Sequence, residues 1–392
     1  MVVTSLMWKS LDRFSRYFGI FWKNPVEWDI KTQTLVFTPI SRKLIPWMVS
    51  VYGFLTVLNG SLLLILISQL YGFAHLKLTK VVILLCWSGH AVFGLVLEIL
   101  VAFTGKNASY AFNCLSALAK KIGGRTSRQK STMLLDLKGI MLNLIVIFLY
   151  LETFNIYLFA IISSNLDPYS QLYPLFVSKG WSFQLLANFG ELLLTLLRFI
   201  CLPVMASYLA LECISTLGKM GVYYMSSRNK VTVDKYLRGY AGLQVIFKIA
   251  DEYLAPSTAV SMFIPMWVSV LLNFISLNLY GIIPPSIFPY FPVAALFVGG
   301  CIRLLLPLLV DLYEECLVLQ ARWRYLLSGS DDKKYLKRKL RSLRSVAVYG
   351  GILGYNLYKC KRSTKMAMAG MFRLEGYSLP GETCSLKSLI PN

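Results

Sequence analysis

The sequence has few charged residues and almost no histidine. Charged residues make up 15% of its 392 positions, and the two histidines are His75 and His90. Soluble domains carry about 25% charged residues, so this composition argues against a soluble protein. Two imidazoles are also too few for a histidine-rich membrane metalloenzyme, because such sites need several imidazoles per metal. We expect neither a metal site nor a cofactor.

Motifs of common enzymes are missing as well. The sequence contains no GxSxG, no P-loop and no HExxH, so a hydrolase, an ATPase and a zinc protease have no support. Its eight cysteines form no CxxC pair, and most lie in apolar runs or beside basic loops. A disulfide framework is therefore not expected, and we predict that the protein is not an enzyme.

Long apolar runs are abundant. Hydrophobic residues make up 56% of the chain, and the mean hydropathy is +0.59. An apolar helix of roughly 20 residues crosses the hydrocarbon core of a bilayer. The sequence thus predicts an all-α polytopic membrane protein with six transmembrane helices. We place these spans at about residues 45–71, 81–104, 139–163, 181–214, 257–280 and 289–319.

The net charge of +21 is distributed unevenly along the chain. Lys and Arg cluster before span one and after spans two, four and six, whereas the alternate loops hold only Lys77, Lys80 and Lys179. Because positively charged loops stay on the cytoplasmic side, the pattern predicts a cytoplasmic N-terminus and short outer loops. The expected partner of this charge is the anionic lipid of the cytoplasmic face, rather than nucleic acid.

Four segments follow from these patterns. Residues 1–44 form a cytoplasmic N-terminal segment with an interfacial helix, and residues 45–319 form the membrane bundle. Residues 320–372 form a basic cytoplasmic anchor that includes the only candidate for a short seventh helix, and residues 373–392 are a polar tail. Spans four and six continue into polar sequence, so their extensions are expected to build a helical cytoplasmic base.

Ionisable side chains within the predicted spans are candidates for function. Each costs about 2.5–3.5 kcal/mol at the bilayer centre by insertion scales and so needs a partner or a water-filled path. Two interpretations stay open, a structural clamp between helices and part of an ion path or gate. The residues are Glu152, Glu191, Arg198 and Arg303.

A second group of residues gathers in the predicted outer half of the bundle. Aromatic walls with a few polar groups are what a pocket for a small organic ligand requires. The same residue types also serve as interface anchors and as hydrogen-bonding partners between helices. The candidate ligand-binding residues are Trp87, His90, Asn155, Tyr157, Trp181, Asn188, Asn273 and Asn278.

The order of these features resembles the arthropod gustatory and odorant receptor family. Residues 236–263 are similar to the family's amphipathic helix before the fifth span, and residues 340–355 (LRSLRSVAVYGGILGY) to its basic and small residues before the last span. The resemblance implies a plasma-membrane protein with seven spans. It also implies a homo- or hetero-tetramer around a pore lined by the seventh helix, opened by a small organic ligand and passing cations.

The end of the sequence departs from the family pattern. The apolar stretch 345–358 is about half a membrane crossing, and basic residues then interrupt it. The pore helix is therefore either displaced to residues 345–358 or truncated away. We expect a chemoreceptor-like ligand-gated cation channel subunit, and the alternatives are a multi-span transporter and a non-conducting truncated receptor subunit.

Overall fold

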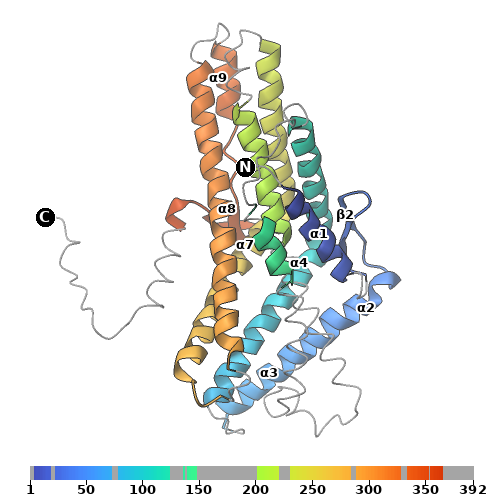
Figure 1. Cartoon of the computed structure of the whole chain (residues 1–392), viewed down its shortest axis with the longest axis vertical. Coiled ribbons are helices and arrows are strands. Elements are labelled where there is room, and N and C mark those ends of the chain that lie inside the picture. Colours follow the sequence, from blue (N-terminus) through green and yellow to red (C-terminus); the bar gives the residue numbers. More distant parts are fainter. Residues whose placement is uncertain are drawn as a thin grey trace, which may run out of the picture.

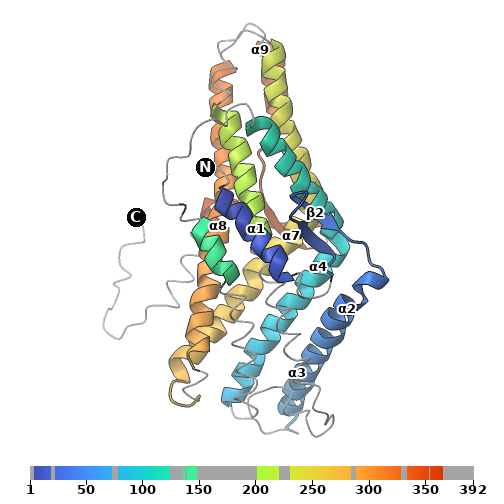
Figure 2. The same cartoon turned by 45° about the vertical axis from the view of Figure 1, so that its right-hand side comes forward.

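Long helices run side by side along the length of the molecule and give it an elongated shape (Figure 1 and Figure 2). The computed structural model describes residues 4–18, 23–72, 78–123, 136, 139–147, 201–219, 230–283, 288–327, 333–352 and 354–364. Its named α-helices are α1 (Ser5–Phe18), α2 (Ile45–Met48), α3 (Leu55–Leu70), α4 (Leu78–Gly123), α7 (Lys230–Asn278), α8 (Tyr290–Leu326) and α9 (Lys333–Ser342). Residues 139–147 and 201–219 are also helical.

Four of the described helices are long and apolar enough to cross a membrane. They cover Ser88–Ile122, Cys201–Lys219, Tyr236–Asn278 and Tyr290–Leu326, and they correspond to predicted spans two, four, five and six. The first predicted span is helical from Ile45 to Leu70, through α2, a π-helical turn and α3. The predicted class of a helical polytopic membrane protein is confirmed.

The helix that contains the second predicted span is longer than that span. Helix α4 continues past Thr104 to Gly123, so Lys106, Lys120 and Lys121 lie on a helix and not in a loop. The extension is amphipathic: Ala111, Phe112 and Leu115 are buried, while the three lysines are exposed. The mean hydropathy falls after Thr104, but apolar residues still recur at helical spacing, and the helix therefore continues.

The predicted amphipathic helix at residues 235–253 is likewise joined to the fifth span. Both belong to α7, which runs without a break for 49 residues and contains Pro256 and Pro265. Its first turns bury Leu237, Tyr240 and Leu243 in the main hydrophobic core. The base is therefore built by α4 and α7 together with the predicted extensions of spans four and six.

The core of this base centres on Tyr240. Its hydroxyl donates to the carbonyl of Arg344 at 3.0 Å and accepts from Gln320 Nε2 at 3.0 Å and from the Val346 amide at 3.3 Å. Its ring meets Trp323 of α8 edge-on, with centroids 5.6 Å apart. One buried tyrosine thus joins α7, α8 and the segment that follows α9.

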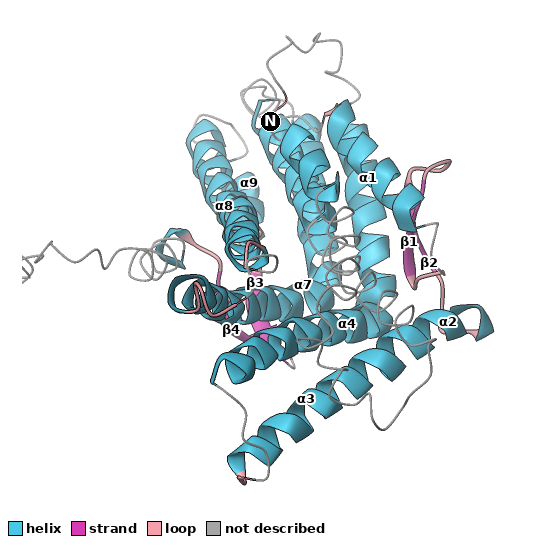
Figure 3. Cartoon of the chain, turned by 60° about the horizontal axis from the view of Figure 1, so that its bottom comes forward, coloured by secondary structure: helices cyan, strands magenta, loops and turns pink. Residues whose placement is uncertain are grey.

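The N-terminal segment docks onto the bundle. Helix α1 buries Met7, Leu11 and Phe14, and Arg13 Nη1 donates to Asn143 Oδ1 at 2.8 Å. The hairpin of β1 (Val26–Asp29) and β2 (Thr34–Phe37) lies beside α1 in Figure 3. A helix is present where the interfacial helix was predicted, and its apolar face packs against protein.

The predicted short seventh helix was wrong for residues 345–358. This stretch contains an antiparallel hairpin of β3 (Tyr349–Ile352) and β4 (Tyr355–Lys359), which lies beside α7 in Figure 3. Glycine disfavours a helix interior, and Gly354 has φ +83° at the turn, a conformation that glycine adopts readily. A side chain at Gly350 would overlap the Tyr358 ring, so close packing also requires glycine here. Tyr358 fixes the hairpin to α7 by donating to the carbonyl of Thr258 at 3.2 Å.

Removing the Tyr240 hydroxyl should loosen the base. Tyr240→Phe removes three hydrogen bonds of the core, those with the Arg344 carbonyl, Gln320 Nε2 and the Val346 amide, so we expect a loss of about 1–3 kcal/mol in the free energy of unfolding. Thermal unfolding in lipid nanodiscs measures this loss. The matched control is Tyr325→Phe on the exposed side of α8, and an equal effect of both variants would contradict the role given to Tyr240.

A charged contact between α7 and α9 should make the base sensitive to acid. Lys339 donates to the Asp234 carboxylate and lowers the pKa of that group below its usual value, and Arg238 Nε contributes a second bond at 2.8 Å. The ionised carboxylate therefore stabilises the folded state. This contribution is complete above the unfolded pKa of about 3.9 and is lost as pH falls through the lower folded pKa.

Asp234→Asn should accordingly lower the unfolding temperature near neutral pH and have a shrinking effect in strong acid. The measurement is the unfolding temperature of both proteins from about pH 7 to about pH 3. Lys334→Gln, which removes an exposed charge from the same helix α9, should show no such pH dependence. A difference between Asp234→Asn and the parent protein that stays constant over this range would contradict the assignment.

Candidate ligand-binding site

Half of the predicted outer ligand residues lie in the described part of the chain. Trp87 and His90 are near the start of α4, and Asn273 and Asn278 are near the end of α7. These two helix ends lie at the same end of the bundle in Figure 1, which is the lower end in that view. Asn155, Tyr157, Trp181 and Asn188 fall outside the described residues. The predicted pocket therefore stays a prediction.

The polar groups of this region are partly used within their own helices. His90 Nδ1 lies 2.8 Å from the carbonyl of Cys86, one turn earlier in α4. The Asn278 amide donates to the carbonyl of Phe274 at 3.2 Å and is exposed. Between the helices, Gly89 of α4 lies against Trp267 and Val268 of α7, where any Cβ would be crowded. Close helix packing and not a polar cluster thus joins α4 to α7 here.

Of the four predicted intramembrane charges, only one lies in the described part of the chain, so no pairing among them can be assigned. Glu152, Glu191 and Arg198 lie outside them, and Arg303 is exposed on α8. Sequence reasoning missed Glu98 of α4, which is 1% exposed and surrounded in sequence by apolar residues. The sequence signal that could have identified Glu98 is its position as a single acidic residue in the apolar run LVLEILVAF.

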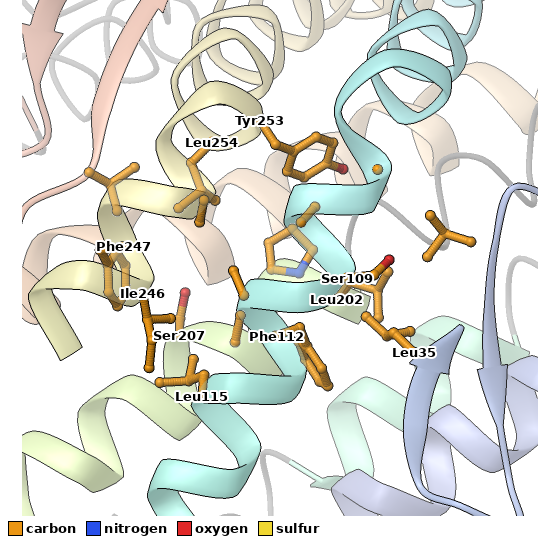
Figure 4. Close-up of a pocket in the computed structure, with 18 of the residues that line it drawn as sticks. Leu35, Ser109, Phe112, Leu115, Leu202, Ser207, Ile246, Phe247, Tyr253 and Leu254 are labelled. Atoms are coloured by element: carbon orange, nitrogen blue, oxygen red, sulfur yellow. The ribbon is translucent and has the colours of Figure 1, made fainter. Parts of the chain in front are cut away.

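A well-defined cavity lies elsewhere, between α4, the helix of residues 201–219 and α7 (Figure 4). Its volume is about 90 Å³. The β1–β2 hairpin closes one side with Val26 and Leu35. Most of the lining is apolar, including Phe112, Leu202 and Phe247, and two buried serines, Ser109 and Ser207, add hydroxyl groups.

This cavity lies at the predicted inner boundary of the membrane. Val101 and Leu202 belong to predicted spans two and four, whereas Phe112 and Phe247 lie beyond the spans, in the helical base. Sequence analysis could not find the cavity, because its walls come from the helix extensions and from the N-terminal hairpin. Among the described residues, no group of three His, Cys, Asp or Glu side chains could hold a metal ion.

Comparison with known proteins was made by sequence and by structure. No family model matches the sequence, and no curated protein matches it. The structure of the insect olfactory receptor OR5 from Machilis hrabei does match, with a TM-score of 0.65 over 94% of this chain and 96% of that chain, at 10% sequence identity. The chain has the fold of an insect olfactory receptor.

A second structure of the same olfactory receptor, in complex with eugenol, gives a TM-score of 0.63 at 11% identity with the same coverage of both chains. The charge pattern and the inner helical extensions of the sequence indicated a resemblance to arthropod chemoreceptors, and the fold confirms it. The two proteins share a fold at very low sequence identity. This is expected where the topology depends on the placement of apolar and basic segments and not on particular residues.

Asn113 should be important for the wall of the cavity. Its side chain accepts from the Leu35 amide and donates to the Leu35 carbonyl, both at 2.8 Å, and so ties β2 to α4. Asn113→Ala should cost about 1–3 kcal/mol of stability and increase hydrogen exchange in residues 26–37. The control is Asn107→Ala, which breaks an exposed bond to Glu252. Unchanged exchange in the hairpin would contradict this contact.

Proposed function

We propose that the protein is an odorant-receptor-type subunit of a ligand-gated cation channel. The observation that carries the proposal is the olfactory-receptor fold, which extends over 94% of the chain at a TM-score of 0.65. The apolar helices supply membrane spans by length and composition. This fold favours a receptor over the transporter, which the sequence alone left as an alternative.

The proposed receptor has a cytoplasmic N-terminus, lies in the plasma membrane and assembles as a homo- or hetero-tetramer. The distribution of charge supports this orientation. Lys120 and Lys121 at the end of α4, Arg324 at the end of α8 and the basic helix α9 are at one end of the molecule, the upper end in Figure 1. Positive charge collected at one end of a bundle is retained on the cytoplasmic side and attracts anionic lipid.

The proposed ligand is a small organic molecule bound in the outer half of the bundle. The eugenol complex of the Machilis hrabei receptor supports this ligand class. Four of the candidate contacts belong to described helices, near the start of α4 and the end of α7. They are Trp87, His90, Asn273 and Asn278. The charged residues Glu152, Glu191, Arg198 and Arg303 remain candidates for a helix clamp or an ion path.

A second candidate function is a non-conducting receptor subunit. It is favoured by the β3–β4 hairpin, which occupies the stretch where the sequence suggested a displaced pore helix. The hairpin is attached to α7 through Tyr358 and to α8 through Lys359, whose Nζ lies 3.5 Å from the centre of the Tyr313 ring. A subunit of this kind would bind ligand and depend on a partner subunit for conduction.

Whole-cell recording distinguishes these two functions. The protein is expressed alone and together with a conducting receptor subunit in cells without other receptors, and a panel of odorants beginning with eugenol is applied. Cation current from the protein alone supports the channel. Current that appears only with the partner supports the non-conducting subunit, and ligand binding without current in either case overturns both.

The predicted outer pocket is tested in the same recordings. Asn273→Ala should raise the half-maximal ligand concentration about three- to tenfold, the effect of losing one hydrogen bond. The control is Asn356→Ala, an exposed position on β4. An equal response from both variants would remove Asn273 from the site.

A further inference from the structure

We propose that the cavity between α4, the 201–219 helix and α7 is a second binding site, for a neutral apolar molecule that carries one hydrogen-bond-accepting oxygen. The site is separate from the outer pocket and does not depend on the proposed receptor function. Its walls come from three long helices and from the β1–β2 hairpin (Figure 4).

The unpartnered hydroxyl of Ser109 points to a ligand. This residue lines the cavity, is 3% exposed, and its Oγ has no hydrogen-bond partner among the described residues. A hydroxyl in a helix ordinarily donates to the carbonyl one turn earlier, as Thr104 Oγ1 does to Leu100 at 2.7 Å. Burial of a hydroxyl without a partner is unfavourable, and an acceptor oxygen on a bound molecule would remove that cost.

The other lining residues determine the polarity and size of the rest of the ligand. Leu202, Ile246 and Leu254 present apolar surface to the cavity, and Ser207, 4% exposed, adds a second hydroxyl from the 201–219 helix. Apolar walls with a few placed polar groups are typical of small-molecule pockets. An apolar cavity of about 150 Å³ binds benzene, so the volume of about 90 Å³ here suits a short chain or part of a small ring.

Charge near the cavity favours a neutral molecule. No charged side chain is among the described lining residues. The charged residues next to the lining in the sequence, Lys106 and Lys248 on one side and Glu27, Asp251 and Glu252 on the other, are of both signs and do not themselves line the cavity. An ion entering the apolar space would lose its hydration without a counter-charge, which is costly. The ligand class is therefore a neutral alcohol, ketone, ester or ether.

Photolabelling of the full-length protein in nanodiscs tests the site. The probe is butanol that carries a diazirine, and mass spectrometry identifies the labelled peptides. We expect labelling of residues 101–115 and 246–254 that excess butanol prevents. Ser109→Ala should weaken half-maximal labelling about three- to tenfold. The matched control, Ser116→Ala, changes a buried serine of α4 that does not line the cavity and should leave labelling unchanged.

A stability measurement separates a ligand contact from a structural one. Ser109→Ala removes an unpartnered buried hydroxyl, so the empty protein should unfold about 1–3 °C higher. A structural hydroxyl would give a decrease in the unfolding temperature. Ala206→Phe fills the cavity and should abolish labelling of both segments, and its folding is checked by gel filtration.

The source of the natural ligand is resolved by extracting lipid from the purified protein. A neutral lipid that the parent protein retains and Ala206→Phe loses would assign the site to the ester region of a membrane lipid. Butanol labelling without retained lipid would assign it to free small molecules. Labelling confined to the outer ends of α4 and α7, or equal labelling of the parent protein and both cavity variants, would overturn the proposal.

Discussion

A chain within a bilayer must satisfy its backbone hydrogen bonds internally, and helices do so locally. In this protein the helices are much longer than the bilayer requires. Helix α4 has 46 residues and α7 has 49, and at about 1.5 Å per residue they extend about 69 and 74 Å. A hydrocarbon core of about 30 Å covers less than half of that length, so the rest must be stabilised by protein.

That stabilisation comes from a core that forms beyond the predicted inner boundary. Tyr240, Gln320 and Trp323 join α7 to α8, and the Arg344 carbonyl brings in the segment after α9. The N-terminal helix packs against the helix of residues 139–147, and the hairpin packs against α4. The cavity lined by Ser109 lies at the predicted inner boundary, where the predicted spans continue into this base.

The sequence predicted the membrane class and the family resemblance, because apolar length and basic charge determine them directly. It did not predict that α4 continues to Gly123, because the extension is amphipathic and its hydropathy falls after Thr104. The hairpin in residues 349–359 was also missed, although Gly350 and Gly351 disfavour a helix and Tyr349, Tyr355 and Tyr358 favour strands. The Ser109 cavity depends on contacts between distant segments, which periodicity does not contain.

The arrangement of the base on one side of the membrane is the central claim, and glycosylation mapping in microsomes tests it most directly. Acceptor tags are inserted before Met1, after Gly72 between α3 and α4, and between Leu327 and Lys333. The account predicts modification of the tag after Gly72 alone, since that loop would face the lumen, while the N-terminus and the α8–α9 connection would stay cytoplasmic. Modification of the tag at the N-terminus or between α8 and α9 would contradict it.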